Sequence, residues 1–174
     1  MQITLLGTVT PHPILERAGP SNHVSIGASS ILVDCGSGVV HQMIKAGVEP
    51  KEIDHLFMTH MHSDHTVDLA HVLITGWIRN RDKPLRVIGP RQTREFVERV
   101  MHAFEFDIRL RKLHDRVGDE IMNIDVVELD DSGTYETDSW KVTAVEVDHG
   151  YVKPALGFTF EDGRYKMMIS GDTT

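Results

Sequence analysis

Four side chains able to bind metal lie within one short segment: His60, His62, Asp64 and His65. In an extended chain, residues two apart point to the same side, so His60 and His62 can offer imidazole nitrogens to one ion. Asp64 and His65 come where a strand gives way to a turn, so they project differently and can serve a second ion. The segment therefore predicts a two-metal site, and such sites generate a nucleophilic hydroxide near neutral pH.

A two-metal site needs more ligands, including a carboxylate able to bridge both ions, and the ends of other strands are where to look. His149 follows an expected strand over residues 142–147. Asp172 follows another, over residues 165–170, in the sequence SGDT. Asp34, at the end of LVDCGSG, either steadies a ligating imidazole or is an ordinary turn carboxylate.

The elements that must position these side chains follow from the hydrophobic pattern and the Gly and Pro breaks. Apolar runs predict strands over residues 2–6, 23–26, 30–34, 55–59, 85–88, 126–129, 140–147, 155–160 and 165–170. Helical periodicity predicts helices over residues 39–46, 68–78 and 93–104. Residues 107–123 give no clear signal. The pattern indicates an α/β layered architecture with substantial antiparallel content.

Composition sets the broad class. A chain of 174 residues, 40% hydrophobic and 25% charged, is expected to form a single domain over residues 1–174. No apolar run approaches the roughly 20 residues that cross a bilayer, so we expect no membrane partner and a cytoplasmic location. The lone Cys35 is expected to be a small buried hydrophobe. The net charge of −8 repels phosphate backbones, which disfavours nucleic acid and favours a small-molecule substrate.

The segments TLLGT, LVDCGSG, THMHSDH, DHG and SGDT occur in the order typical of the metallo-β-lactamase superfamily. Over its whole length the chain most resembles the ribonuclease Z and arylsulfatase branch. The resemblance implies an αββα sandwich, here incomplete at the C-terminus, with the site along one edge. It implies two divalent cations, zinc first and manganese or iron as alternatives. The ligands it implies are His60, His62 and His149 for one ion, Asp64 and His65 for the other, and Asp172 as the bridge.

The activity implied is that of a hydrolase whose metal-activated hydroxide attacks an ester, lactone, sulfate or phosphodiester. Asp64 is expected to act catalytically, by orienting that hydroxide or accepting its proton. Two alternatives stay open: a ribonuclease Z-like endonuclease that processes transfer RNA 3′ ends, and a non-catalytic binding or assembly module. Two features count against the endonuclease. Only 23 positions (172 − 149) separate His149 from Asp172, where ribonuclease Z commonly inserts an RNA-binding arm, and Asp68 replaces its usual glycine.

Members of the superfamily continue past the bridging aspartate to one more histidine ligand, whereas this chain ends at Thr174. We therefore expect the N-terminal portion of a longer protein, a ligand supplied by a partner or swapped copy, or a weakly held second metal. Uncovered sheet edges and apolar faces would favour a homo-oligomer.

The features outside the motifs are expected to be structural. Surface or core positions are predicted for the other histidines, His12, His23, His41, His55, His71, His102 and His114. Core packing is predicted for Trp77, Phe96, Phe104 and Phe106, and solvated surface for Arg79, Arg81 and Lys83.

Overall fold

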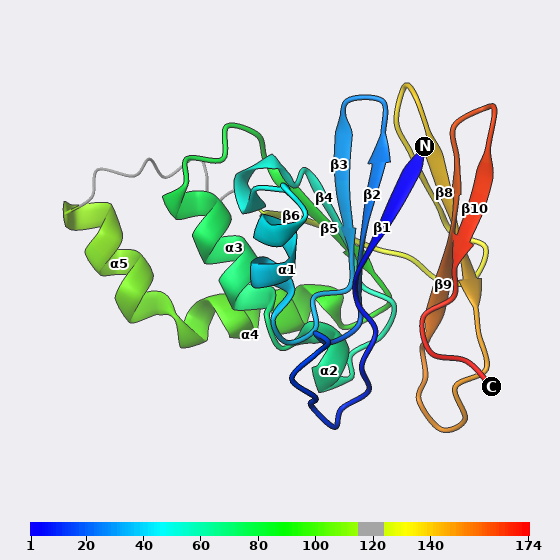
Figure 1. Ribbon diagram of the computed structural model, residues 1–174, viewed down its shortest axis with the longest axis horizontal. Coiled ribbons are helices and arrows are strands. Elements are labelled where there is room, and N and C mark those ends of the chain that lie inside the picture. Colours follow the sequence, from blue (N-terminus) through cyan, green and yellow to red (C-terminus); the bar gives the residue numbers. More distant parts are fainter. Residues whose placement is uncertain (115–123) are drawn as a thin grey trace.

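The computed structural model describes residues 1–114 and 124–174 and forms a layered sandwich (Figure 1). A six-stranded and a four-stranded sheet face each other, and helices lie against the outer face of the six-stranded sheet. Within the described residues, no helix covers the outer face of the four-stranded sheet. The α/β sandwich expected from the sequence is confirmed, with one helical layer in the described part of the chain.

The six-stranded sheet changes from antiparallel to parallel at its third strand. Its order is sequential, from β1 to β6. The strands are β1 Gln2–Gly7, β2 Ser21–Ile26, β3 Ser29–Val33, β4 His55–Phe57, β5 Leu85–Gly89 and β6 Ile124–Glu128. Because β3 to β6 run parallel, their carboxyl ends meet at one edge, where Asp34 follows β3 and His60 follows β4.

The four-stranded sheet is antiparallel throughout, in the order β10-β9-β8-β7. Its strands are β7 Thr134–Glu136, β8 Lys141–Glu146, β9 Leu156–Glu161 and β10 Lys166–Ile169. The β8–β9 connection carries His149, and Asp172 follows β10. The backbone N–H of Leu156 donates to the carbonyl of Thr59 at 2.9 Å, so the two sheets are joined beside the metal motif.

Aromatic side chains fill the space between the sheets. Phe57 is fully buried and meets Phe158 and Phe160 edge-on, at ring-centroid distances of 5.1 and 5.2 Å. The Trp140 indole N–H donates to Ser29 Oγ at 2.9 Å across the sandwich. Such edge-to-face contacts add to the free energy of burial and fix how the sheets face each other.

The helical layer packs on the other face of the six-stranded sheet (Figure 1). Its elements are α1 Val39–Lys45, the 3-10 turn η1 Pro50–Glu52, α2 Ser63–Thr66, α3 Leu69–Ile78, α4 Thr93–Ala103 and α5 Glu105–His114. Most of α3 is buried, and Trp77 is fully so, as predicted. No helix in the described residues is long and apolar enough to span a bilayer.

Some sequence-based predictions were wrong. Phe104 and Phe106 are 43% and 69% exposed, because α4 ends at Ala103 and α5 extends away from the sandwich (Figure 1). Arg81 is buried, since its guanidinium reaches between α3 and η1 to donate to the carbonyls of Val72 and Pro50. Strand β7 and helix α5 were not predicted; residues 115–123 of the unassigned stretch lie outside the described residues.

Candidate metal centre

The metal motif begins where β4 leaves the sheet. The Met58 N–H still donates to the Ile88 carbonyl of β5, and the chain then turns into α2, with His62 at its N-cap. His60 is fully buried, and Met61 packs into the core on the helical side. Alternation along this extended segment therefore directs His60 and His62 away from Met61, as predicted.

Three imidazoles converge at the first half of the site. His60 Nε2 lies 3.0 Å from His62 Nδ1, and His149 Nε2 lies 3.3 Å from the same atom. All three ligand atoms lie within 4.8 Å of one another. His149 comes from the loop between β8 and β9, so both sheets contribute to this group. The arrangement can hold one cation with three nitrogen ligands.

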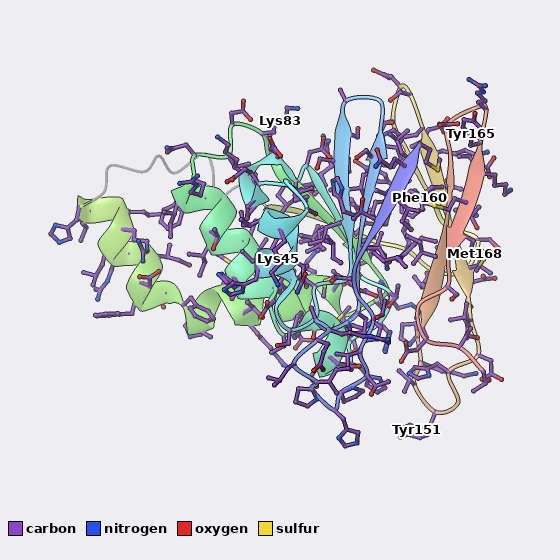
Figure 2. The ribbon with its side chains drawn as sticks, in the orientation of Figure 1. Lys45, Lys83, Tyr151, Phe160, Tyr165 and Met168 are labelled. Atoms are coloured by element: carbon purple, nitrogen blue, oxygen red, sulfur yellow. The ribbon has the colours of Figure 1, made fainter. Side chains whose placement is uncertain are left out.

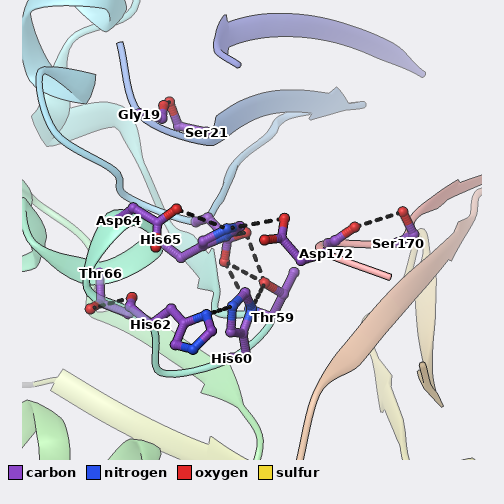
Figure 3. Close-up of polar contacts among 12 residues, drawn as sticks. Gly19, Ser21, Thr59, His60, His62, Asp64, His65, Thr66, Ser170 and Asp172 are labelled. Atoms are coloured by element: carbon purple, nitrogen blue, oxygen red, sulfur yellow. Dashed lines mark hydrogen bonds and ion pairs between the residues drawn. The ribbon is translucent and has the colours of Figure 1, made fainter. Parts of the chain in front are cut away.

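A second group shares His60 and adds His65 and Asp172, again within 4.8 Å (Figure 3). Asp172 Oδ1 lies 3.3 Å from His65 Nε2, and its Oδ2 lies 3.9 Å from His149 Nε2, so one carboxylate faces both groups. Gly171, at φ 63°, brings the chain close enough that an added Cβ would meet the Thr59 Cβ at 2.8 Å. Glycine in SGDT therefore positions Asp172.

Asp64 stands slightly apart from these groups. Its Oδ2 lies 3.8 Å from His65 Nε2, but Asp64 belongs to neither group of closely spaced ligand atoms. It lines a cleft of about 170 Å³ between the motif and the N-terminal loop. The cleft is lined by Val9, Thr10, Pro11, Pro13, Gly19, Ser37, Ser63, Asp64 and Val67. A substrate could therefore reach Asp64 from this side.

Asp34 holds the two buried histidines in place. Its Oδ2 accepts from His65 Nδ1 at 2.8 Å, and its Oδ1 accepts from the Thr59 backbone N–H at 2.8 Å. The Thr59 hydroxyl donates to Asp34 Oδ2 at 2.9 Å and lies 3.0 Å from His60 Nδ1. Since Nδ1 of each ring is engaged, the Nε2 atoms of His60 and His65 face the site.

Of the two roles the sequence left open for Asp34, the contacts therefore support the steadying one. Thr59 was missed by sequence reasoning. The available signal was a hydroxyl at the end of an otherwise apolar strand, directly before the motif.

The electrostatics of the site act in opposite directions on the two buried histidines. Burial, together with the neighbouring histidines, lowers the pKa of His60 to about 3. Burial also disfavours the charged form of His65, but the hydrogen bond that its Nδ1–H donates to Asp34, together with the nearby carboxylates, outweighs burial and raises the pKa of His65. The Nε2 atom of His65 is buried and has no hydrogen-bond partner among the described residues. An unpartnered, buried nitrogen beside carboxylates fits a bound cation.

The remaining histidines that the structure places in or near the core are satisfied by protein groups. His55 Nδ1 lies 2.6 Å from Asp54 Oδ1, and its Nε2 lies 3.0 Å from the Tyr135 hydroxyl. His23 Nε2 lies 2.9 Å from Ser30 Oγ. His71 is exposed and contacts only the His41 ring among the described histidines. None of these belongs to either group of closely spaced ligand atoms among the described residues.

The β-lactamase superfamily domain matches residues 29–174, most of the chain. The chain belongs to the β-lactamase superfamily. Ribonuclease Z from Mycolicibacterium gilvum (strain PYR-GCK) is 39% identical over 176 residues, covering 99% of this chain and 62% of the relative. Ribonuclease Z from Mycobacterium bovis (strain BCG / Pasteur 1173P2) is 38% identical, with 99% and 63% covered. The chain thus spans less than two thirds of the length of these curated relatives.

Solved structures show the same superfamily fold. The short form of human tRNase Z superposes with a TM-score of 0.79 at 24% identity, covering 99% of this chain and 69% of that one. The metallo-β-lactamase fold protein YhfI from Bacillus subtilis gives a TM-score of 0.72 at 18% identity, with 98% and 61% covered. The expected metallo-β-lactamase fold is therefore confirmed.

These matches correct one prediction. The expectation that nucleic acid is disfavoured as a partner is wrong, because the curated relatives are named for cleaving RNA. A match of 176 positions over a chain of 174 residues also leaves no room for a long insertion in the matched part of these relatives. The short spacing between His149 and Asp172 therefore does not separate this superfamily member from ribonuclease Z. Net charge was a poor guide, because it averages over a surface that a substrate meets only locally.

Proposed function

We propose that this chain is the metal-binding domain, over residues 1–174, of a hydrolase that cleaves RNA phosphodiester bonds in the manner of ribonuclease Z, with a transfer RNA precursor as substrate. The observation that carries the proposal is the pair of ligand groups that share His60 and face one carboxylate, Asp172. The ribonuclease Z relatives supply the substrate class. A cytoplasmic location goes with this proposal.

One divalent cation would be held by His60, His62 and His149. A second would be held by His65 and Asp64, and Asp172 would contact both cations. We propose zinc, because imidazole nitrogens dominate the donor set and carboxylates complete it. Such ions, when bound, polarise a phosphoryl oxygen and lower the pKa of water.

The chain's own residues would orient the reactants and move the proton. Asp34 and Thr59 fix the His60 and His65 rings, so the ligand atoms need little rearrangement. Asp64, on the wall of the cleft, would accept a proton from the attacking water as the water oxygen bonds to phosphorus and the scissile P–O bond breaks. The leaving oxygen would keep the bonding electron pair and take up a proton from solvent. The Asp64 carboxylate lies 3.8 Å from His65 Nε2, which places it next to the proposed ligands of the second cation.

A cleavage assay tests the proposal. The chain is incubated with zinc and an end-labelled transfer RNA precursor that carries a 3′ trailer, and the product ends are mapped. We expect cleavage at the 3′ end of the mature region. His62→Ala should lower the rate at least about 100-fold, since a ligand is lost, while the matched control His71→Ala, an exposed histidine outside the centre, should not change it.

Two results would contradict the proposal. One is zinc-dependent hydrolysis of a lactone or sulfate ester with the RNA left intact, which would return the site to small-molecule chemistry. The other is RNA cleavage that His62→Ala leaves unchanged, which would indicate a contaminating nuclease.

A further inference from the structure

An exposed tyrosine stands beside the metal centre. Tyr151 is 96% exposed and lies in the loop between β8 and β9, two residues after His149 (Figure 2). A single exposed ring is ordinary on a protein surface. The position of Tyr151 is not, because two residues of chain reach at most about 7 Å from a predicted metal ligand.

The loop that carries this ring is held in place. The Val152 N–H donates to the His149 carbonyl at 3.1 Å, and the Gly150 N–H donates to Asp148 Oδ1 at 3.0 Å. The Thr174 N–H donates to the Asp148 carbonyl at 2.9 Å, which ties the loop to the segment that carries Asp172. The ring is therefore presented from a fixed base, as a preorganised binding group requires.

One cationic side chain lies on the same loop as the ring. Lys153 is exposed and forms no ion pair with any residue that the structure describes. It lies two positions from Tyr151 on the same loop. Lys153 shares the lining of a cleft with Arg91 and with three acidic residues, Asp130, Asp131 and Glu146, so its charge is partly offset there. What it offers a nucleic acid is therefore a direct contact with a single backbone phosphate.

We propose that Tyr151 stacks on an unpaired nucleobase next to the scissile phosphodiester, with Lys153 contacting a backbone phosphate. This inference rests on the proposed function, because only an RNA substrate brings bases to the site. An aromatic platform suits a single strand of any sequence, since every base has a π face. Tyr151 is thus a positioning residue for the nucleotide that flanks the cleaved bond.

Equilibrium binding tests the role without requiring turnover. The dissociation constant of a short, fluorescein-labelled single-stranded RNA is measured by anisotropy with zinc present, for the unaltered chain and for Tyr151→Ala, Tyr151→Phe and Tyr151→Trp. We expect Tyr151→Ala to weaken binding about 5- to 100-fold, and the two aromatic replacements to bind like the unaltered chain.

The matched control is Tyr165→Ala. Tyr165 is 51% exposed and lies at the opposite end of the same sheet, beside Arg164 (Figure 2). Its removal should leave the RNA affinity unchanged. Since both tyrosines are exposed, neither variant should change the melting temperature, which circular dichroism checks.

A series of RNAs with one abasic nucleotide each identifies the contact. At one position, loss of the base should weaken binding to the unaltered chain and abolish the difference between it and Tyr151→Ala. The inference is overturned if Tyr151→Ala binds RNA as tightly as the unaltered chain, or loses the same affinity whichever base is absent. If the unaltered chain binds no RNA, the proposed function fails as well, so the two failures are distinguishable.

Discussion

At the scale of single residues, the metal centre depends on a carboxylate that is not itself a predicted ligand. Asp34 is 2% exposed and connects to His65 directly and to His60 through Thr59. Its backbone, at φ 60°, is in the left-handed region that asparagine and aspartate tolerate best. Replacement by asparagine therefore preserves backbone and shape while removing the charge and one acceptor.

We expect Asp34→Asn to weaken zinc binding about 10- to 100-fold, because the imidazoles lose the partner that orients them. Competition with a zinc chelator measures the affinity. Asp54→Asn is the matched control, since Asp54 bonds to His55 Nδ1 in the same manner, at 2.6 Å, but away from the centre. Equal zinc affinity in Asp34→Asn and the unaltered chain would show that Asp34 is only a turn residue.

At the scale of elements, α3 carries a glycine where helical propensity would favour alanine by roughly 1 kcal/mol. Gly76 faces the buried guanidinium of Arg81, and an added Cβ would overlap its Nη2 atom and come within 2.9 Å of the Pro50 carbonyl oxygen. Arg81 cannot readily move, because it donates to the carbonyls of Pro50 and Val72, both at 3.3 Å.

Gly76→Ala is therefore expected to destabilise the fold, by about 1–3 kcal/mol, against the sign of helix propensity. Urea denaturation measures the free energy of unfolding. In the double variant Gly76→Ala/Arg81→Met, the loss should be smaller than the sum of the single losses, since the clash is gone. A single Gly76→Ala variant more stable than the unaltered chain would contradict the packing described here.

At the scale of the whole molecule, the centre draws its side chains from both sheets. His60 and His65 follow β4 of the six-stranded sheet, while His149 and Asp172 follow β8 and β10 of the four-stranded one. A bound cation would tie the sheets together at the edge where they already share the Leu156–Thr59 hydrogen bond.

Zinc should therefore raise the melting temperature. At about 100 times its dissociation constant it contributes about 2.7 kcal/mol, which corresponds to a shift of roughly 5–10 °C for a chain of this size. Calorimetry with and without zinc measures the shift, and elemental analysis should find two equivalents of zinc per chain. His149→Ala should reduce the shift and His71→Ala should not. An unchanged melting temperature with saturating zinc would argue against a centre that bridges the sheets.

The sequence by itself determined what depends on neighbouring residues. Alternation along an extended segment separates His60 and His62 from Met61, and strand patterns place His149 and Asp172 at strand ends. Most predicted strands and helices lie within a few residues of those observed, since hydrophobic periodicity is a local property.

Only the tertiary structure decided which distant groups meet. Asp34 and Thr59 are 25 positions apart, and their contact exists because β3 pairs with β4 in parallel register. Burial was equally undecided: Arg81 is enclosed and Phe106 exposed, the reverse of what their side chains suggest, because the path of α3 to α5 fixes which surfaces are covered. Strand pairing and packing are long-range, so local spacing identified the candidate ligands, while the arrangement of the sheets determined their supports and surroundings.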